Sequence, residues 1–85
     1  MINVIDKLKY NNVKKMYENY YDYLNFFNID KLTLRHCNKI EKVTNFKNIK
    51  ILNLSECTNL SVIDKIENIG YLNLSNTKNI NEINN

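Results

Sequence analysis

An internal repeat of 20 residues constrains this chain more than any other feature. Three successive segments align without a gap: residues 29–48 (IDKLTLRHCNKIEKVTNFKN), 49–68 (IKILNLSECTNLSVIDKIEN) and 69–85 (IGYLNLSNTKNINEINN), the last of which we interpret as incomplete. Self-similarity at a fixed period of about 20 to 50 residues is the signature of a repeat architecture, in which neighbouring units bury a shared core. The positions that match are mainly apolar: Leu32, Leu52 and Leu72; Leu34, Leu54 and Leu74; Cys37, Cys57 and Thr77; Ile40, Leu60 and Ile80; Val43, Ile63 and Ile83.

Each unit combines two spacings of apolar residues. The pair Leu52 and Leu54 has a period of two, which places both side chains on one face of a short strand. The apolar residues that follow, Cys57, Leu60 and Ile63, recur at every third position. This period is shorter than the roughly 3.6 residues per turn of an α-helix and suits 3₁₀ or polyproline-like segments. The sequence therefore predicts stacked coils, each with a strand, a turn and an extended or 3₁₀ return path.

The segment before the repeats, residues 1–28, fits two interpretations. Apolar residues spaced mostly three to five apart indicate one loosely amphipathic helix or two short ones. Tyr20 and Tyr23 instead continue the three-residue spacing backwards, as in a degenerate repeat whose two leucine positions hold Asn12 and Lys14. We favour a helical N-terminal cap with an aromatic core, because the first coil would otherwise expose its apolar side chains.

The second copy has a regular spacing between Ile49, Leu52, Leu54, Cys57 and Leu60, and its counterparts recur in the other copies. This spacing resembles the LxxLxLxxCxxL pattern of the leucine-rich repeat family. The resemblance covers residues 29–85 and implies an α/β solenoid with a short parallel sheet on its concave face. Because the unit is shorter than is common in that family, it also implies a thin convex side without helices. Similar short repeat proteins rich in Asn and Ile occur in A/T-rich genomes, including those of large DNA viruses, so a viral source is implied.

Composition excludes several classes of function. With 85 residues, the chain has room for one small domain. Twelve basic and nine acidic side chains are spread along the whole chain and sum to +3, so neither nucleic acid nor an anionic membrane is expected as a partner. No apolar run is long enough to span a bilayer, and residues 1–9 lack the apolar core of a signal peptide. We therefore expect a cytoplasmic protein.

No combination of residues predicts an enzyme, a cofactor site or a metal site. Cys37 and Cys57 occupy the turn position where the third copy has threonine, so we expect inward-facing structural thiols, although stacked coils would tolerate a disulfide. His36 is the only histidine, and Glu56 in the next coil could orient its ring, but no activated nucleophile accompanies this pair. Gly70 is the only glycine, which excludes a glycine-rich phosphate loop.

A partner protein is expected on the concave face of the sheet, where side chains alternate with the inward leucines. Asn, Ser and Thr supply adaptable donors and acceptors there, and Ile51, Tyr71 and Arg35 are candidate anchors. The sequence thus predicts a non-enzymatic protein-interaction module. The predicted contact residues form four columns: Lys31, Ile51 and Tyr71; Thr33, Asn53 and Asn73; Arg35, Ser55 and Ser75; His36, Glu56 and Asn76.

The predicted strand at residues 71–75 supports an alternative function. This strand would be an exposed edge of the sheet, and such edges recruit other strands. The protein would then be a scaffold that forms homo-oligomers through this edge, or a piece of a longer repeat array. In either case we expect concentration-dependent self-association or marginal stability.

Overall fold

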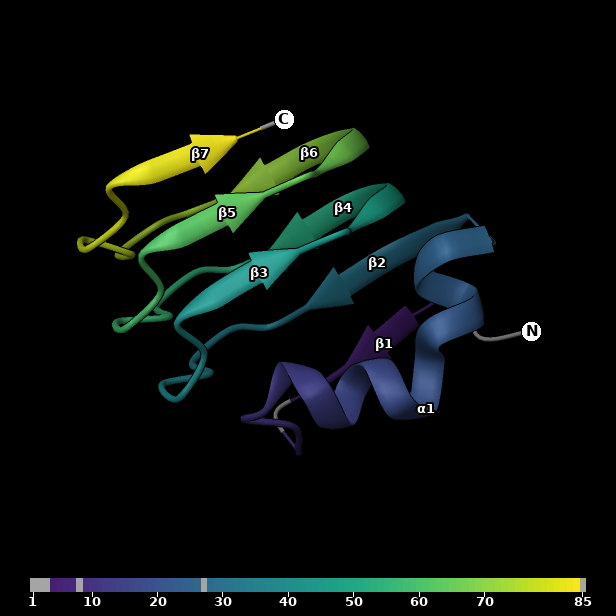
Figure 1. Cartoon of the computed structure of the whole chain (residues 1–85), viewed down its shortest axis with the longest axis horizontal. Coiled ribbons are helices and arrows are strands. Elements are labelled where there is room, and N and C mark those ends of the chain that lie inside the picture. Colours follow the sequence, from purple (N-terminus) through teal and green to yellow (C-terminus); the bar gives the residue numbers. More distant parts are fainter. Residues whose placement is uncertain (1–3, 8, 27, 85) are drawn as a thin grey trace.

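Two parallel sheets and one helix make up the computed structural model of this protein, which describes residues 4–7, 9–26 and 28–84 (Figure 1). Strands β1, β2, β4 and β6 form a four-stranded sheet in that order, and β3, β5 and β7 form a three-stranded sheet. The elements follow the chain as β1 (Val4–Asp6), α1 (Val13–Phe26), β2 (Ile29–Thr33), β3 (Lys42–Thr44), β4 (Lys47–Asn53), β5 (Val62–Asp64), β6 (Glu67–Asn73) and β7 (Glu82–Asn84).

From β2 onwards, the register of both sheets follows the internal repeat. Leu32 in β2 lies opposite Leu52 in β4, which lies opposite Leu72 in β6. In the other sheet, Val43 in β3 lies opposite Ile63 in β5. Each of these pairs joins residues that the alignment of the three copies superimposes. Chemically similar side chains therefore stack along both sheets, strand upon strand.

Inward-facing side chains of both sheets form one apolar core. The four leucines of the first two Leu-x-Leu motifs are fully buried, as are the later inward residues Cys37, Val43, Cys57, Leu60 and Ile63 of the same coils. Removing a side chain of this size from water contributes about 1.5–3 kcal/mol to stability. The core comprises Ile5, Met16, Leu24, Ile29, Leu32, Leu34, Cys37, Ile40, Val43, Phe46, Ile49, Leu52, Leu54, Cys57, Leu60 and Ile63.

The predicted fold class is wrong. We expected an α/β leucine-rich repeat solenoid with one short sheet and an extended or 3₁₀ convex side. The structure is instead a small α/β fold of 33 × 26 × 18 Å with two parallel sheets and one short helix. Where the sequence predicted the return path, β3, β5 and β7 pair over three residues each, and the described residues contain no 3₁₀ helix.

The shortness of these strands explains the error. In β3 and in β5, only the middle residue is fully buried in the core, namely Val43 and Ile63. The next inward residues, such as Leu60, lie in the neighbouring turn. Apolar residues therefore fall three apart along the sequence because a turn at residues 58–59, a three-residue strand and a bend at Lys65 follow one another, not because the backbone is a 3₁₀ helix. A strand with one inward residue cannot display the alternation by which strands are recognised.

Strand β1 lies inside the segment that we interpreted as a helical cap. Ile5 pairs with Leu32, so this strand precedes β2 by 27 residues rather than by 20. The additional residues accommodate α1. Asn12 caps this helix, because its Oδ1 accepts hydrogen bonds from the backbone N–H groups of Lys14 (2.9 Å) and Lys15 (3.4 Å). In the degenerate-repeat interpretation, Asn12 and Lys14 would occupy the two leucine positions of a strand. The structure instead places Asn12 at the cap of α1 and Lys14 in its first turn.

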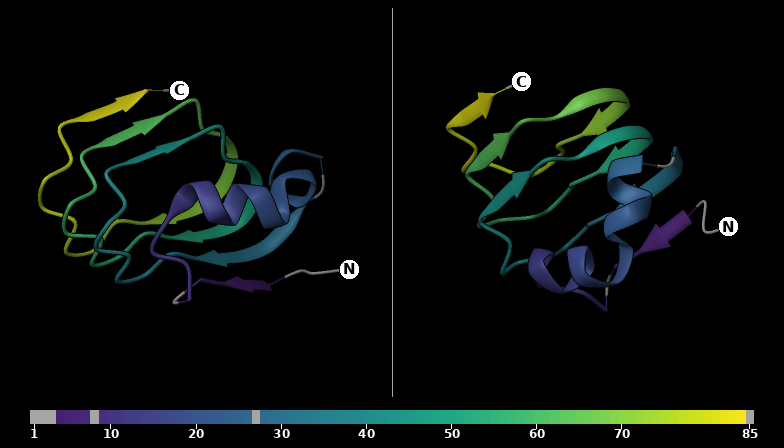
Figure 2. Two further views of the ribbon diagram at one scale, coloured as in Figure 1. Left: turned by 60° about the horizontal axis from the view of Figure 1, so that its bottom comes forward. Right: turned by 45° about the vertical axis from the view of Figure 1, so that its right-hand side comes forward.

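Helix α1 packs against the end of the core that lies farthest from β7 (Figure 2). It is bent at Tyr20, where φ is −131° and ψ is 21°. Met16 and Leu24 are fully buried, and the ring of Tyr17 meets that of Phe46 edge-on at 5.6 Å. No helix among the described residues is long and apolar enough to cross a membrane. Residues 1–3, 8 and 27 of the predicted cap, and residue 85 of the third copy, lie outside the described residues, and the division at residue 28 stays a prediction.

Asparagines occupy several positions where the backbone turns sharply, either between strands or near the start of β4 and β6. Among the described non-glycine residues with positive φ, four are asparagines: Asn45, Asn48, Asn68 and Asn76. Asparagine adopts this left-handed conformation more readily than other residues with a side chain. Asn68 also donates from Nδ2 to Oδ1 of Asn48 (2.9 Å), which ties one corner to the next. Part of the asparagine content therefore has a structural role.

Candidate functional site

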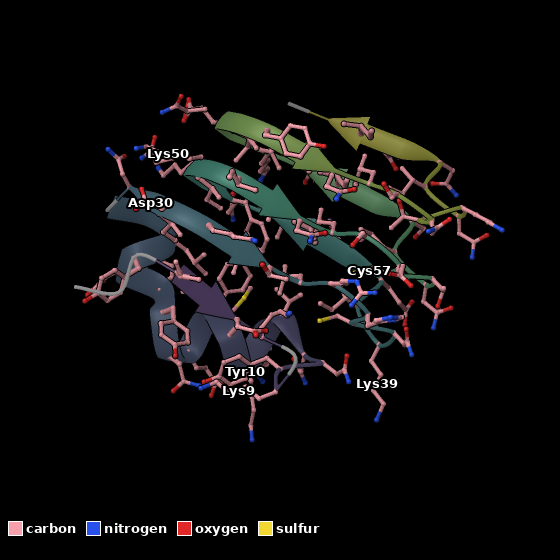
Figure 3. The ribbon with its side chains drawn as sticks, turned by 180° about the vertical axis from the view of Figure 1, so that it is seen from behind. Lys9, Tyr10, Asp30, Lys39, Lys50 and Cys57 are labelled. Atoms are coloured by element: carbon pink, nitrogen blue, oxygen red, sulfur yellow. The ribbon has the colours of Figure 1, made fainter. Side chains whose placement is uncertain are left out.

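The outward face of the four-stranded sheet carries a line of exposed side chains that crosses all four strands. Val4 in β1, Lys31 in β2, Ile51 in β4 and Tyr71 in β6 lie opposite one another in register. Val4 is 59% exposed, Ile51 41% and Tyr71 60%, and Lys31 is also exposed. We call these four residues the cross-strand stripe. Figure 3 looks onto this face of the molecule.

A second line of residues lies beside the stripe, and its side chains are polar. Thr33, Asn53 and Asn73 are half-buried and lie opposite one another, and Asp6 in β1 extends the line. Oδ1 of Asn53 accepts a hydrogen bond from the backbone N–H of Ser55, and Asn73 repeats this contact with Ser75, both at 2.9 Å. These amides therefore hold the beginning of each turn in place.

The predicted columns at positions 35 and 36 lie in turns, not on the strands, because β2 ends at Thr33. The strand pairing nevertheless continues into these turns: the backbone N–H of His36 donates to Ser55 O at 3.1 Å. Glu56 lies between two basic groups, with Oε2 2.8 Å from Arg35 Nε and Oε1 3.2 Å from His36 Nε2. Ser55 is buried, whereas Ser75 and Asn76 are exposed. The turns that follow β2, β4 and β6 thus form a polar border to the sheet face.

The opposite border of the stripe is also charged. Lys50 Nζ lies 3.5 Å from Asp30 Oδ1, and both side chains are largely exposed (Figure 3). Gly70 is the next residue in this line, and the space beside it is tight, because a Cβ atom there would lie 2.7 Å from the carbonyl oxygen of Lys50. Only glycine fits this close approach of two backbones without a shift.

Sequence reasoning missed the part of this face that β1 contributes, namely Val4 and Asp6. The signal was weak because the inward positions of this segment are Ile5 and Lys7, so the Leu-x-Leu motif is replaced by Ile-x-Lys. The twelve contact residues that the sequence did predict all lie on the strands of this sheet or in the turns that border it. The structure therefore brings the twelve residues together as neighbours on one side of the molecule.

The turn residues also border a hollow in the surface. This open hollow of about 370 Å³ is lined by His36, Glu56, Thr58, Asn76, Lys78 and Asn79. Both carboxylate oxygens of Glu56 are already engaged by Arg35 and His36. Among the described residues, no group of three or more His, Cys, Asp or Glu side chains is placed to hold a metal ion.

Both cysteines are free and buried, and each thiol donates to a backbone carbonyl. Cys57 Sγ donates to Leu34 O at 2.7 Å, and Cys37 Sγ donates to Tyr10 O at 3.2 Å. In the third copy, the hydroxyl of Thr77 donates to Leu74 O instead. Burial raises the pKa of Cys37 to about 11 and also raises that of Cys57. Protonated donors of this kind tie turns to the backbone and are poor nucleophiles.

These thiol pKa values predict a loss of stability at alkaline pH. The folded protein retains thiol protons that the unfolded chain releases, so the contribution of both thiols is fully present below the ordinary thiol pKa of 9.0. The contribution of Cys37 is lost as pH rises through about 11, and that of Cys57 as pH rises through its own raised pKa. We expect urea midpoints to fall over this interval. Burial also raises the pKa of Tyr17, which lowers stability at alkaline pH in the same way. The wild type is therefore compared with Cys57→Thr, whose urea midpoint should fall less over the same pH interval. Equal falls in the two proteins would contradict the assignment to the thiols.

No family model, no curated protein and no solved structure matches this chain.

Proposed function

We propose that this protein is a non-enzymatic interaction module that binds another protein through the outward face of its four-stranded sheet. One observation carries the proposal: Ile51 and Tyr71 lie directly opposite each other on β4 and β6 and are both substantially exposed. Adjacent large apolar side chains on a polar surface favour contact with a partner. Tyrosine is also among the residues that contribute most to binding energy at protein interfaces.

The surroundings of this apolar pair support the same function. A charged border lies on each side of it, formed by Asp30 with Lys50 and by Arg35 with Glu56. Protein interfaces commonly have an apolar centre and a polar rim of this kind. The resemblance to the leucine-rich repeat family, the cytoplasmic location and the viral source remain predictions.

Replacing Tyr71 with alanine tests this function. The proposal predicts that a partner protein captured from a cell extract binds the Tyr71→Ala variant at least about 30-fold more weakly, because removing a central anchor costs about 2 kcal/mol or more. Tyr21→Ala is the matched control, since Tyr21 is 55% exposed but lies on α1, away from the sheet. Equal binding by wild type and Tyr71→Ala would contradict the proposal, as would equal losses in the two variants. Binding is measured by titration of the purified partner.

Self-association through the C-terminal edge of the two sheets, formed by β6 and β7, is the second candidate function. In the described residues, β6 and β7 each have a neighbouring strand on one side only. Core positions are also less well covered there: Leu72 and Leu74 are half-buried and Ile83 is 52% exposed, whereas Leu52 in β4 is fully buried. Edge strands with apolar side chains favour pairing with a further strand.

Sedimentation velocity over a wide concentration range tests this second function. We expect the wild type to associate as its concentration rises and Ile83→Lys to remain monomeric, because the charge would have to be buried at the contact. A wild type that is monomeric at every concentration would exclude self-association.

A further inference from the structure

The spacing of the cross-strand stripe contains information about the partner, given the proposed function of this face. Val4, Lys31, Ile51 and Tyr71 occupy equivalent positions on neighbouring strands, because the register places each opposite the next. Neighbouring strands are separated by about 4.8 Å, so the stripe extends over about 14 Å across the sheet. A partner that contacts the whole stripe must present side chains at this interval.

An α-helix presents side chains at nearly this interval. Residues three or four apart lie on one face of a helix, and at about 1.5 Å per residue they are separated by about 4.5–6 Å along its axis. Four residues at positions i, i+3, i+7 and i+10 extend over about 15 Å, close to the length of the stripe. In an extended strand, residues on one face are about 6.8 Å apart, so four of them extend over about 20 Å. A helix lying across the strands therefore matches the stripe, whereas an extended segment in the same direction does not.

The charge on the stripe defines one of the partner's side chains. Lys31 lies between Val4 and Ile51 in register, and it makes no ion pair with any other residue that the structure describes. The neighbouring lysine, Lys50, already has Asp30 as its partner. A helix packed on Val4 and Ile51 would cover Lys31, and an acidic side chain at that point would compensate the charge.

We propose that the partner binds this face with an amphipathic α-helix that lies across the strands. Its contact face carries three apolar residues, packed on Val4, Ile51 and Tyr71, and one Asp or Glu opposite Lys31. The acidic residue is the second of the four contact residues counted from the Val4 end.

Selection from two peptide libraries tests this inference. One library displays a randomised helix face on a rigid helical hairpin, and the other displays randomised extended loops of equal length. We expect binders that require Tyr71 to come from the helical library, with an acidic residue between apolar ones. Each selected helix should bind Lys31→Glu at least tenfold more weakly, and exchanging its acidic residue for lysine should restore binding to that variant. Lys50→Glu, which alters a lysine outside the stripe, should change binding less.

The outcomes separate this inference from the function on which it rests. Binders that require Tyr71 but come from the extended library would overturn the helical partner and leave the interaction face intact. Helical binders that respond equally to Lys31→Glu and Lys50→Glu would overturn the acidic contact. If neither library yields a binder that requires Tyr71, the proposed function itself is contradicted.

Discussion

Replacing Leu52 with alanine is expected to lower the free energy of unfolding by about 2–5 kcal/mol, the range found when a fully buried leucine is truncated. Leu52 has no accessible surface and lies between Leu32 and Leu72 in register, so neighbouring strands hold the new cavity open from both sides. A chain of this length has a total stability of only about 4–13 kcal/mol. The variant is therefore expected to lose a large share of its stability, as measured by urea unfolding followed by circular dichroism.

Leu72→Ala provides the matched control, because it removes the same atoms from the same column. Leu72 is half-buried and lies in the edge strand β6, where it has one neighbouring strand among the described residues. Less apolar area returns to water there, and the site can relax more freely. A loss for Leu72→Ala that equals or exceeds that for Leu52→Ala would contradict the placement of the core.

The alignment of the three copies predicted which residues face each other. Leu32, Leu52 and Leu72 form one column, and Cys37 and Cys57 are buried at equivalent turn positions. This information is accessible from sequence because each strand pairs with the equivalent strand of the next copy, so the sheet has the register of the repeat itself. The same alignment placed the predicted contact residues on one side of the molecule.

The second sheet could not be derived in the same way. Strand β5 has one inward residue, Ile63, and its other two side chains are half-buried, so it lacks an alternating pattern. The interval of three that results is shared by 3₁₀ and polyproline-like segments. Periodicity alone therefore does not distinguish a short strand between two turns from these conformations.

Strand β1 was missed for a different reason. The offset from β1 to β2 is 27 residues, which breaks the period of 20, and the position next to Leu34 in the core is filled by Lys7. A lysine at a buried leucine position contradicts the expectation that long charged side chains face water. As a consequence, Val4 and Asp6 were absent from the predicted contact face. No pattern in the chain compensates for these two departures.

Lys7 is a buried charged residue whose replacement by an apolar one should stabilise the protein. Its side chain has no accessible surface, and the backbone N–H of Lys7 donates to Thr33 O at 3.2 Å, which continues the pairing of β1 with β2. The ammonium lies 3.5 Å from Asp6 Oδ1, whose side chain is 65% exposed. When a buried charge is paired with a largely hydrated partner, their attraction offsets little of the free energy that burying the charge costs.

Lys7→Met is accordingly expected to raise the free energy of unfolding by about 1–4 kcal/mol, because the cost of burying the lysine charge is removed while Asp6 stays largely hydrated. Methionine is unbranched and flexible, so it can follow the path of the lysine stem through the core. Lys50→Met is the control: Lys50 also pairs with an aspartate at 3.5 Å, but its side chain is 74% exposed, so the change should be within about 0.5 kcal/mol. Urea unfolding of the three proteins at neutral pH measures both changes. A Lys7→Met variant that is less stable than wild type would contradict this prediction. It would show that the Lys7 ammonium stabilises the core through interactions beyond its contact with Asp6.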